Sequence, residues 1–300
     1  MGVGSRAVVA LSGPSLVILA AGRARRYGGV KQLAPIGKHG EGVIDLLASD
    51  AYAAGFDDIV IVVNADTGPM IEQHVSWHWP KGRKVTFAIQ SKLRGTVEAV
   101  LAAESSLDLS KPFGVSNADD LYGREAFMRL GAHLAESPEH CLVGFELDRA
   151  LVGNLQVSRG TCMVEDGVLT DIIERRNVHA TNEGYDADDG LEPESLSPLT
   201  TVSMNLWGFQ PSIVPYMHKS IEAHDFSEES EIQLSTFVGQ LLKTEKPRFD
   251  VLQTRSRCIG VTHAQDLAVA QLLVRLEIEV GQRPEYAFAE GSTTTPPAVD

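Results

Sequence analysis

Residues Leu16-Val-Ile-Leu-Ala-Ala-Gly22 form a short, wholly apolar run that stops at a glycine. Such a run is typical of a strand that is buried on both faces of a parallel sheet. A second run, Ile59 to Val63, is rich in β-branched residues and also predicts a buried strand. Between and after these runs, helices are predicted at 43–54, 70–77 and 97–103, and further strands at 85–89 and 113–115. This order predicts an α/β fold with a mostly parallel sheet flanked by helices.

The second half of the chain has a less regular pattern. It predicts a hairpin at 161–173, a strand at 200–209, and helices at 232–242 and 269–280. Because no repeat or linker separates the halves, we expect a single domain over 15–282, divided at about residue 125. Small, polar and proline-rich residues predict a flexible leader at 1–14 and a flexible tail at 283–300.

Composition excludes several classes of protein. The chain has 300 residues, of which 43% are hydrophobic and 22% charged, as in ordinary globular proteins. Its longest apolar stretch is far shorter than the ~20 residues of a membrane helix, and no secretory signal is visible. The three cysteines are widely spaced, which favours a reducing, cytoplasmic location over a disulfide framework. The net charge of −14 disfavours nucleic acid as a partner, and no membrane partner is expected.

The loop after the first predicted strand is the most basic short stretch of this acidic chain. Between Gly22 and Lys31 it contains three arginines and a lysine. Loops at the carboxyl ends of parallel strands bind ligands, and their backbone N–H groups can face a phosphate. The loop is therefore a candidate anion site, although a solvated basic turn would explain the charge equally well.

Asn117-Ala-Asp-Asp120 follows the fourth predicted strand. Carboxylates at this edge of the sheet suit Mg²⁺, which prefers one or two carboxylates together with substrate phosphates. The alternative is that Asp119 or Asp120 caps the helix expected near Gly123. His74 and His78 are four residues apart, but the tryptophans beside them favour packing over metal binding.

The first loop resembles the signature of the sugar-phosphate nucleotidyltransferases, the nucleotide-sugar pyrophosphorylase superfamily. The similar residues are Leu19-Ala-Ala-Gly22, Arg26 and Lys31-Gln-Leu-Ala-Pro-Ile36. The resemblance implies that Arg26 holds the β- and γ-phosphates and that Lys31 contacts phosphates at the reacting centre. The sequence departs from the family at Ala24 and Arg25, where glycine and threonine are usual.

Later elements resemble the same family in order and spacing. Asp119 corresponds to the family's metal ligand, and Glu174-Arg175 to a Glu-Lys pair that binds sugar hydroxyls and the sugar phosphate. Asn205 lies on a strand similar to the one that walls the sugar site. The second metal-binding aspartate of many members has no equivalent, since Asp266 falls too late and is expected to cap the last helix. The nucleotide-binding residues implied are Leu19, Ala20, Ala21, Gly22, Arg23, Gln32, Gln90, Gly95 and Thr96.

The resemblance implies a Rossmann-like nucleotide-diphospho-sugar transferase fold. Residues 15–125 would bind a nucleoside triphosphate, and the mixed, β-rich residues 126–282 would bind a sugar phosphate. With Mg²⁺ as cofactor, the enzyme would join a nucleoside triphosphate to a sugar 1-phosphate and release pyrophosphate. A homo-oligomer is compatible with this assignment.

The amide of Gln90 predicts a base preference. It presents one acceptor and one donor side by side, which match the N3–H and a carbonyl of uracil or thymine. We therefore expect UTP or dTTP ahead of CTP, ATP and GTP. Gln32 resembles a second base-contacting position of thymidylyltransferases.

Three alternatives remain at the level of the sequence. A metal-dependent GT-A-type glycosyltransferase usually has Asp-x-Asp where this chain has Asn117-Ala-Asp119. A cytidylyltransferase acting on an alditol phosphate or phosphonate, and a non-catalytic nucleotide-binding regulator, are the others. The acidic segment 183–194 has few large apolar groups, so we expect a poorly ordered loop that covers the acceptor.

Overall fold

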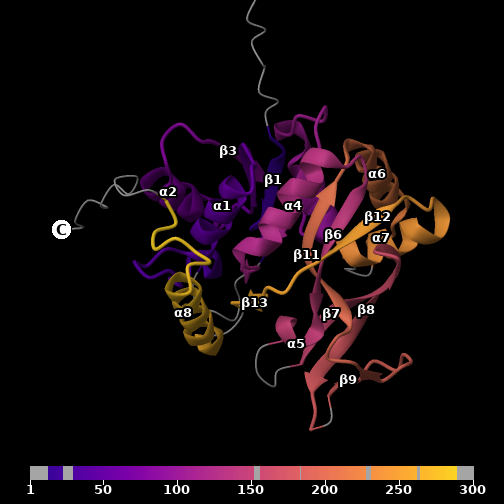
Figure 1. Ribbon diagram of the computed structural model, residues 1–300. Helices are drawn as coiled ribbons and strands as arrows, with labels where there is room; N and C mark the ends of the chain where they lie inside the picture. The colour runs from indigo at the N-terminus through magenta and orange to yellow at the C-terminus, as the bar shows by residue number, and fades with distance from the viewer. Residues whose placement is uncertain are drawn as a thin grey trace, which may run out of the picture.

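The computed structural model describes residues 13–22, 30–151, 156–182, 184–227, 231–261 and 264–288. These residues form an 11-stranded sheet with the strand order β10-β9-β8-β12-β6-β11-β4-β1-β2-β3, in which β7 pairs with β11 and β8. Figure 1 shows this sheet crossing the molecule with helices on both sides. Its strands are β1 (Ser15–Leu19), β2 (Asp58–Val63), β3 (Lys84–Ile89), β4 (Phe113–Asn117), β6 (His140–Glu146), β7 (Val157–Glu165), β8 (Val168–Ala180), β9 (Tyr185–Ala187), β10 (Ser195–Leu196), β11 (Thr201–Phe209) and β12 (Phe249–Gln253).

The parallel half of the sheet confirms the predicted α/β fold. Strand β1 pairs in parallel with β2 and β4, and β2 pairs in parallel with β3. Strand β11 runs antiparallel between β4 and β6, which makes the sheet mixed at its centre. A second, 2-stranded sheet joins β5 (Asp120–Leu121) to β13 (Ile259–Gly260).

Strand β1 is buried on both faces because its residues alternate between two hydrophobic clusters. Leu16 and Ile18 pack into one cluster with α1 and α4. Val17 and Leu19 pack into the other with α3, α6 and α7. The helices are η1 (Lys31–Leu33), α1 (Val43–Ala53), α2 (Gly68–His78), α3 (Thr96–Ala102), η2 (Glu104–Ser106), α4 (Arg124–Glu136), α5 (Leu147–Ala150), η3 (Pro211–Ile213), α6 (Val214–Ala223), α7 (Leu234–Thr244) and α8 (Ala264–Glu279).

His74 and His78 take part in packing, as their neighbours suggested. The Nε2 atom of His74 lies 2.9 Å from both carboxylate oxygens of Asp45, which also accepts a hydrogen bond from the Trp79 indole at 2.6 Å. The ring of His78 packs against that of His74 at a tilt of 36°, with a centroid separation of 4.5 Å. Asp45 thus ties α1 to α2.

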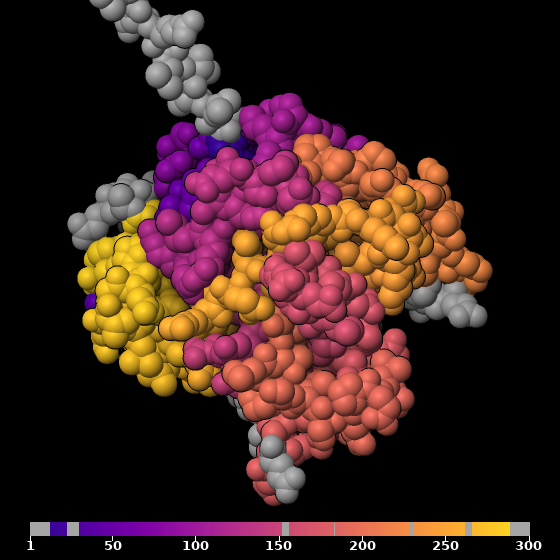
Figure 2. All heavy atoms as spheres, turned by 45° about the vertical axis from the view of Figure 1, so that its right-hand side comes forward, coloured from indigo at the N-terminus to yellow at the C-terminus, as the bar shows by residue number. Residues whose placement is uncertain are grey.

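The folded part of the chain extends past residue 282, so the predicted tail boundary was too early. Arg283 is buried, and its guanidinium donates to both carboxylate oxygens of Asp50 on α1, at 3.0 and 2.8 Å. Figure 2 shows the yellow C-terminal segment lying against the indigo and violet first half. Within the described residues, no helix combines the length and apolar character that crossing a membrane requires.

The described part of the acidic segment, residues 184–194, is held in place, contrary to the sequence prediction. It contains β9, and Asp189 accepts two hydrogen bonds from Arg175 of β8 at 2.8 and 3.0 Å. Arg175 also donates to the carbonyls of Leu191 and Pro193. The segment is therefore ordered around a buried arginine that its composition did not reveal. Glu183 lies outside the described residues.

Candidate active site

The carboxyl ends of β1 and β4 lie side by side, with Leu19 opposite Asn117. Beyond them, Ala118 donates its backbone N–H to the carbonyl of Leu19 at 3.2 Å. The side chain of Asn64, just past β2, donates to the carbonyl of Ala21 at 2.8 Å. These bonds fix the chain where it leaves the sheet, and two cavities adjoin this edge.

The larger cavity has a volume of about 780 Å³ and lies over the ends of β1 and β4 and the start of α3. Gln90 lies in its wall, and the amide Nε2 of Gln90 donates to the carbonyl of Gly95 at 3.1 Å. Arg94 stacks on Phe226 at its rim, with the guanidinium carbon 4.1 Å from the ring centroid. The described lining comprises Leu19, Ala21, Gly22, Gln90, Leu93, Arg94, Gly95, Thr96, Ala99, Asn117, Asp119, Asn205, Phe226, Glu231 and Gln233.

Gly95 is required by the close approach of two backbones at this cavity. Its φ of +105° is a conformation that other residues rarely adopt, and a β-carbon there would lie 2.4 Å from the carbonyl oxygen of Ile232. Ile232 donates its N–H to the carbonyl of Arg94 at 3.0 Å, and Leu234 donates to the hydroxyl of Thr96 at 2.8 Å. The segment before α7 thus forms one wall of the larger cavity.

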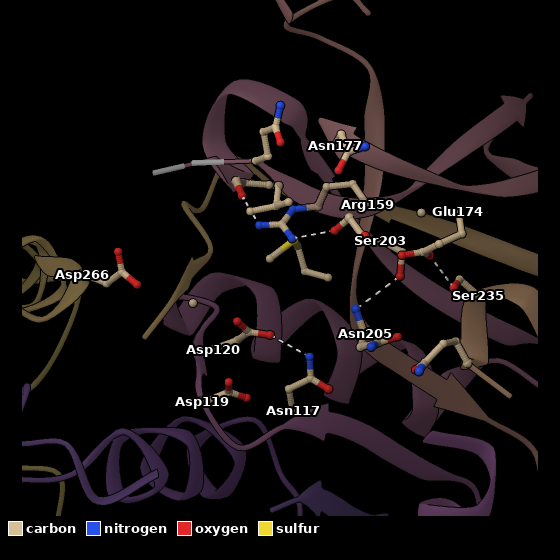
Figure 3. A pocket seen from close by; sticks show the side chains of 18 residues that line it. Asn117, Asp119, Asp120, Arg159, Glu174, Asn177, Ser203, Asn205, Ser235 and Asp266 are labelled. Atoms are coloured by element: carbon tan, nitrogen blue, oxygen red, sulfur yellow. Dashed lines mark hydrogen bonds between the residues drawn. The ribbon is translucent and has the colours of Figure 1, made fainter. Parts of the chain in front are cut away.

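The smaller cavity, about 480 Å³, lies between the β7–β8 hairpin and the loop after β4. Four carboxylates line it, those of Asp119, Asp120, Glu174 and Asp266, and Figure 3 shows them on its different walls. Glu174 accepts a hydrogen bond from the hydroxyl of Ser235 at 2.7 Å. The other polar side chains of the described lining are Asn117, Gln156, Ser158, Arg159, Asn177, Ser203, Asn205, Gln233 and Ser235.

The two cavities meet at four residues that line both: Asn117, Asp119, Asn205 and Gln233. Lys31 forms an ion pair with Asp119 at this junction. Asn205 has a φ of +61°, and the pairing of β11 with β6 shifts register between Ser203 and Trp207. This bulge turns Asn205 out of the regular strand pattern and toward the junction.

A buried hydroxyl links the two sides of the junction. Tyr122 donates to the carbonyl of Met204 at 2.8 Å and accepts from the backbone N–H of Asn117 at 3.0 Å. Asp120 is buried beside it and accepts a hydrogen bond from the Asn117 side chain at 2.7 Å. Burial, together with the charge of Asp119, raises the pKa of Asp120 to about 6. A second, buried carboxylate therefore lies next to Asp119 at the junction.

The structure brings together most of the site residues predicted from the sequence. Leu19, Ala21, Gly22, Gln90, Gly95 and Thr96 line the larger cavity, and Glu174 and Asn205 line the smaller one. Asp119 lines both, and Lys31 reaches the site through its ion pair with Asp119. Arg23 and Arg26 lie outside the described residues.

Three predicted residues lie elsewhere. Ala20 is fully buried in the core. Gln32 is also buried, with its amide donating to the carbonyl of Ala20 at 3.2 Å, and it lines neither cavity. Arg175 is 3% exposed and turned toward Asp189, so its guanidinium is already engaged outside both cavities.

Comparison with known protein families identifies the family of this chain. The family model of the MobA-like NTP transferase domain matches residues 16–165, half of the chain. The chain belongs to this family. The resemblance to nucleotidyltransferases is thereby confirmed, and the alternative of a glycosyltransferase is not supported. No curated protein sequence matches the chain.

Solved structures resemble this NTP transferase over almost its whole length. An inositol-1-phosphate CTP transferase from T. maritima has a TM-score of 0.65 at 13% identity, covering 89% of this chain and 97% of its own. A UDP-glucose pyrophosphorylase in complex with UDP-glucose has a TM-score of 0.63 at 16% identity, covering 88% and 99%. At such identities the likeness establishes the nucleotide-diphospho-sugar transferase-like fold.

The junction of this NTP transferase suits a hard cation. Within the described ranges, no group of three or more His, Cys, Asp or Glu side chains is placed to hold a metal ion. Mg²⁺ does not require one, since it commonly takes one or two carboxylates and completes its coordination with phosphates and water. Asp119, one-fifth exposed between the two cavities, fits that role. Asp266 lies in the first turn of α8 and also lines the smaller cavity, which the sequence interpretation did not foresee.

The sequence interpretation gave no role to several residues of the site. Gln233 and Ser235 come from the start of α7, and Arg159 comes from β7, all far along the chain from the first loop. The pairing of β7 with β8 and β11 brings Arg159 to the site, and hydrogen bonds between the segment before α7 and the start of α3 bring Gln233 and Ser235 there. In the sequence, Arg159 opens the segment 159–175 that resembles the family's hairpin, but the resemblance gave it no role.

Proposed function

We propose that this NTP transferase joins a nucleoside triphosphate, with UTP or dTTP preferred, to a sugar 1-phosphate and releases pyrophosphate. The observation that carries the proposal is the meeting of two cavities at Asn117, Asp119, Asn205 and Gln233. A transfer between two substrates needs two adjoining sites whose contents meet at one point. The junction supplies that point, and a carboxylate and a lysine lie there.

The larger cavity is the proposed nucleotide site. Most of its wall comes from residues before 165, within the part of the chain that matches the family model. Its volume of about 780 Å³ is within the range of small-molecule sites. Arg26, which the family motif alone supports, would hold the β- and γ-phosphates in the loop before Lys31.

The smaller cavity is the proposed sugar-phosphate site. Apart from Arg159, the polar side chains of its described lining are carboxylates, amides and hydroxyls, which suit a polyhydroxylated ligand. Glu174, steadied by Ser235, would accept hydrogen bonds from sugar hydroxyls. Asn205, held at the junction by the bulge in β11, would contact the sugar phosphate where it meets the nucleotide.

In the reaction, an oxygen of the sugar phosphate attacks the α-phosphorus of the triphosphate, and the bond to pyrophosphate breaks. No general base is needed, because the attacking phosphate is already an anion. The residues must instead align two anions and offset their repulsion. Lys31 would leave Asp119 and neutralise charge near the α-phosphate, and Mg²⁺ held by Asp119 would supply further positive charge there.

The preference for uracil or thymine rests on the orientation of Gln90. The carbonyl of Gly95 can only accept a hydrogen bond, so the amide nitrogen of Gln90 must face it. The amide oxygen remains to accept the N3–H of uracil or thymine. Because N3 of cytosine carries no hydrogen, we expect at least ~10-fold discrimination against CTP from one lost hydrogen bond.

Pyrophosphate release from a panel of triphosphates and phosphorylated acceptors tests the proposal. The panel pairs UTP, dTTP, CTP, ATP and GTP with sugar 1-phosphates, an alditol phosphate and a phosphonate. We expect release only when a triphosphate and a sugar 1-phosphate are both present, with UTP or dTTP fastest. A Gln90→Ala variant should narrow the gap between UTP and CTP. Equal use of CTP and UTP by the wild type would refute the base preference, and absence of release from every pair would refute the activity.

A further inference from the structure

The smaller cavity contains a positive charge whose described partners are all uncharged. Among the described residues that line it, Arg159 is the only lysine or arginine. Its Nη1 donates to the carbonyl of Ser158 at 2.8 Å, and its Nη2 donates to the carbonyl of Ala150 at 2.9 Å. Its Nε is buried and has no hydrogen-bond partner among the residues that the structure describes. The guanidinium is therefore held in position by backbone carbonyls but has an unused donor.

Arg175, the neighbouring arginine, has the negatively charged partner that Arg159 lacks among the described residues. Arg159 on β7 lies directly opposite Arg175 on β8 in the hairpin register. Like charges at directly opposite positions destabilise a strand pair. Arg175 is compensated by its ion pair with Asp189 at 2.8 Å, whereas the carbonyl partners of Arg159 provide no counter-charge. In this hairpin, Arg175 is therefore engaged in a structural ion pair, and Arg159 lines the cavity.

The charges around Arg159 make it the most favourable position in the smaller cavity for an anionic ligand. Figure 3 shows Arg159 on the wall that faces Asp120 and Asn117, across the cavity from the loop after β4. The four carboxylates of the lining repel an anionic group placed near them, so Arg159 is the favourable position for one. A guanidinium binds phosphate through parallel N–H bonds, and Nε is one of the donors used.

Arg159 is also close to the reacting centre. Among the described residues, Arg159 lines the same cavity as Asn117, Asp119 and Asn205, which also line the larger cavity. This shared lining places Arg159 in the cavity that opens onto the junction. A phosphate bound at Arg159 would therefore lie beside the point where the two cavities meet.

We propose that Arg159 binds the phosphate of the acceptor. The inference rests on the proposed function, in which the smaller cavity holds a phosphorylated acceptor, and it assigns the role that the sequence motif gave to Arg175. It specifies a phosphomonoester as the ligand class, since a dianion best matches the paired donors of a guanidinium.

The test uses inorganic phosphate as the probe. The nucleotide site is first saturated with the unreactive α,β-methylene analogue of UTP, so that phosphate binds only in the smaller cavity. Isothermal titration calorimetry then measures the phosphate affinity of the wild type, Arg159→Gln, Arg159→Lys and the matched control Arg176→Gln. Arg176 follows Arg175 on β8, is exposed, and lines neither cavity.

We expect Arg159→Gln to weaken phosphate binding by about 10- to 100-fold, the usual effect of losing charge-assisted hydrogen bonds. Arg159→Lys keeps the charge and should lose less, and Arg176→Gln should match the wild type. Affinity for the UTP analogue should stay within about 2-fold in all variants, which shows that they are folded. Unchanged phosphate affinity in Arg159→Gln, or no phosphate binding by the wild type, would overturn the inference.

Steady-state turnover of sugar 1-phosphates by the wild type and Arg159→Gln separates this inference from the proposed function. If the wild type binds phosphate through Arg159 but accepts no sugar 1-phosphate in turnover, the acceptor class is wrong and the role of Arg159 stands. If sugar 1-phosphates are turned over and Arg159→Gln leaves their KM unchanged, the proposed function stands and the role of Arg159 is wrong.

Discussion

Replacing Lys31 by methionine should strengthen metal binding and weaken catalysis. In the structure, the ammonium group of Lys31 is paired with Asp119, the carboxylate proposed to hold Mg²⁺. The lysine thus occupies the place of the cation, and metal binding must displace it. Lys31→Met removes this competition and should also remove a positive charge that the triphosphate needs.

The expected gain in metal affinity follows from the burial of the pair. The two side chains are 19% and 20% exposed, so the pair is stronger than the ~0.2–1 kcal/mol of a fully exposed ion pair. The attraction at an effective dielectric of about 20 is about 4 kcal/mol, most of which desolvation offsets. A net value of about 1.4 kcal/mol corresponds to a tenfold tighter metal Kd in the variant.

The assay is Mn²⁺ binding followed by electron paramagnetic resonance without nucleotide. The matched control is Lys38→Met, since Lys38 pairs with Glu285 on the surface and lines neither cavity. We expect about tenfold tighter Mn²⁺ binding in Lys31→Met, no change in Lys38→Met, and loss of binding in Asp119→Asn. Weaker or unchanged Mn²⁺ affinity in Lys31→Met would refute the idea that lysine and metal share one carboxylate.

Three further predictions concern the framework of the site. Gly95→Ala should destabilise the protein by about 2–3 kcal/mol in urea unfolding, because its φ and its approach to Ile232 both exclude a β-carbon; a loss below about 0.5 kcal/mol would contradict this. Burial lowers the pKa of His140 to about 4, below the unfolded value of about 6.5. The neutral His140 ring therefore contributes its full stabilisation of the folded state above pH 6.5, and this stabilisation is lost as the pH falls toward 4. Between pH 7 and 5 the free energy of unfolding of the wild type should fall by about 2 kcal/mol more than that of His140→Asn. Parallel plots of unfolding free energy against pH for the two proteins would contradict this prediction. Tyr122→Phe should fold but lower kcat more than it raises the KM for the triphosphate, because the hydroxyl joins both sides of the junction; unchanged kcat would remove its positioning role.

The parts of the fold that follow from local pattern could be predicted from the sequence. Strand β1 is apolar from Leu16 onward because both of its faces are buried, and the run at 16–21 therefore predicted it. The position of Asp119 at the edge of the sheet could be predicted for a similar reason, because the carboxyl end of a strand is fixed once the strand is known. Strands β6 and β12 were not predicted, although they complete the sheet between β11 and β8.

The parts of the site that depend on pairing between distant segments could not be predicted. The motif predicted Arg175 as the phosphate ligand. In the structure Arg175 forms an ion pair with Asp189, whereas Arg159, opposite it in the hairpin, does not. Gln32 follows Lys31 directly, yet the short helix at 31–33 turns its side chain into the interior. In both cases the local sequence is right for the motif, and tertiary contacts decide where the side chain lies.

The central claim is that a phosphate oxygen of the acceptor attacks the α-phosphorus of the triphosphate at the junction around Asp119. The most direct measurement is mass spectrometry of the products formed from UTP and a sugar 1-phosphate labelled with ¹⁸O throughout its phosphate group. The account predicts that the nucleotide sugar retains every labelled oxygen, that the pyrophosphate is unlabelled, and that Asp119→Asn forms product at least ~10² more slowly. Label in the pyrophosphate or in free phosphate, or full activity of Asp119→Asn, would contradict it.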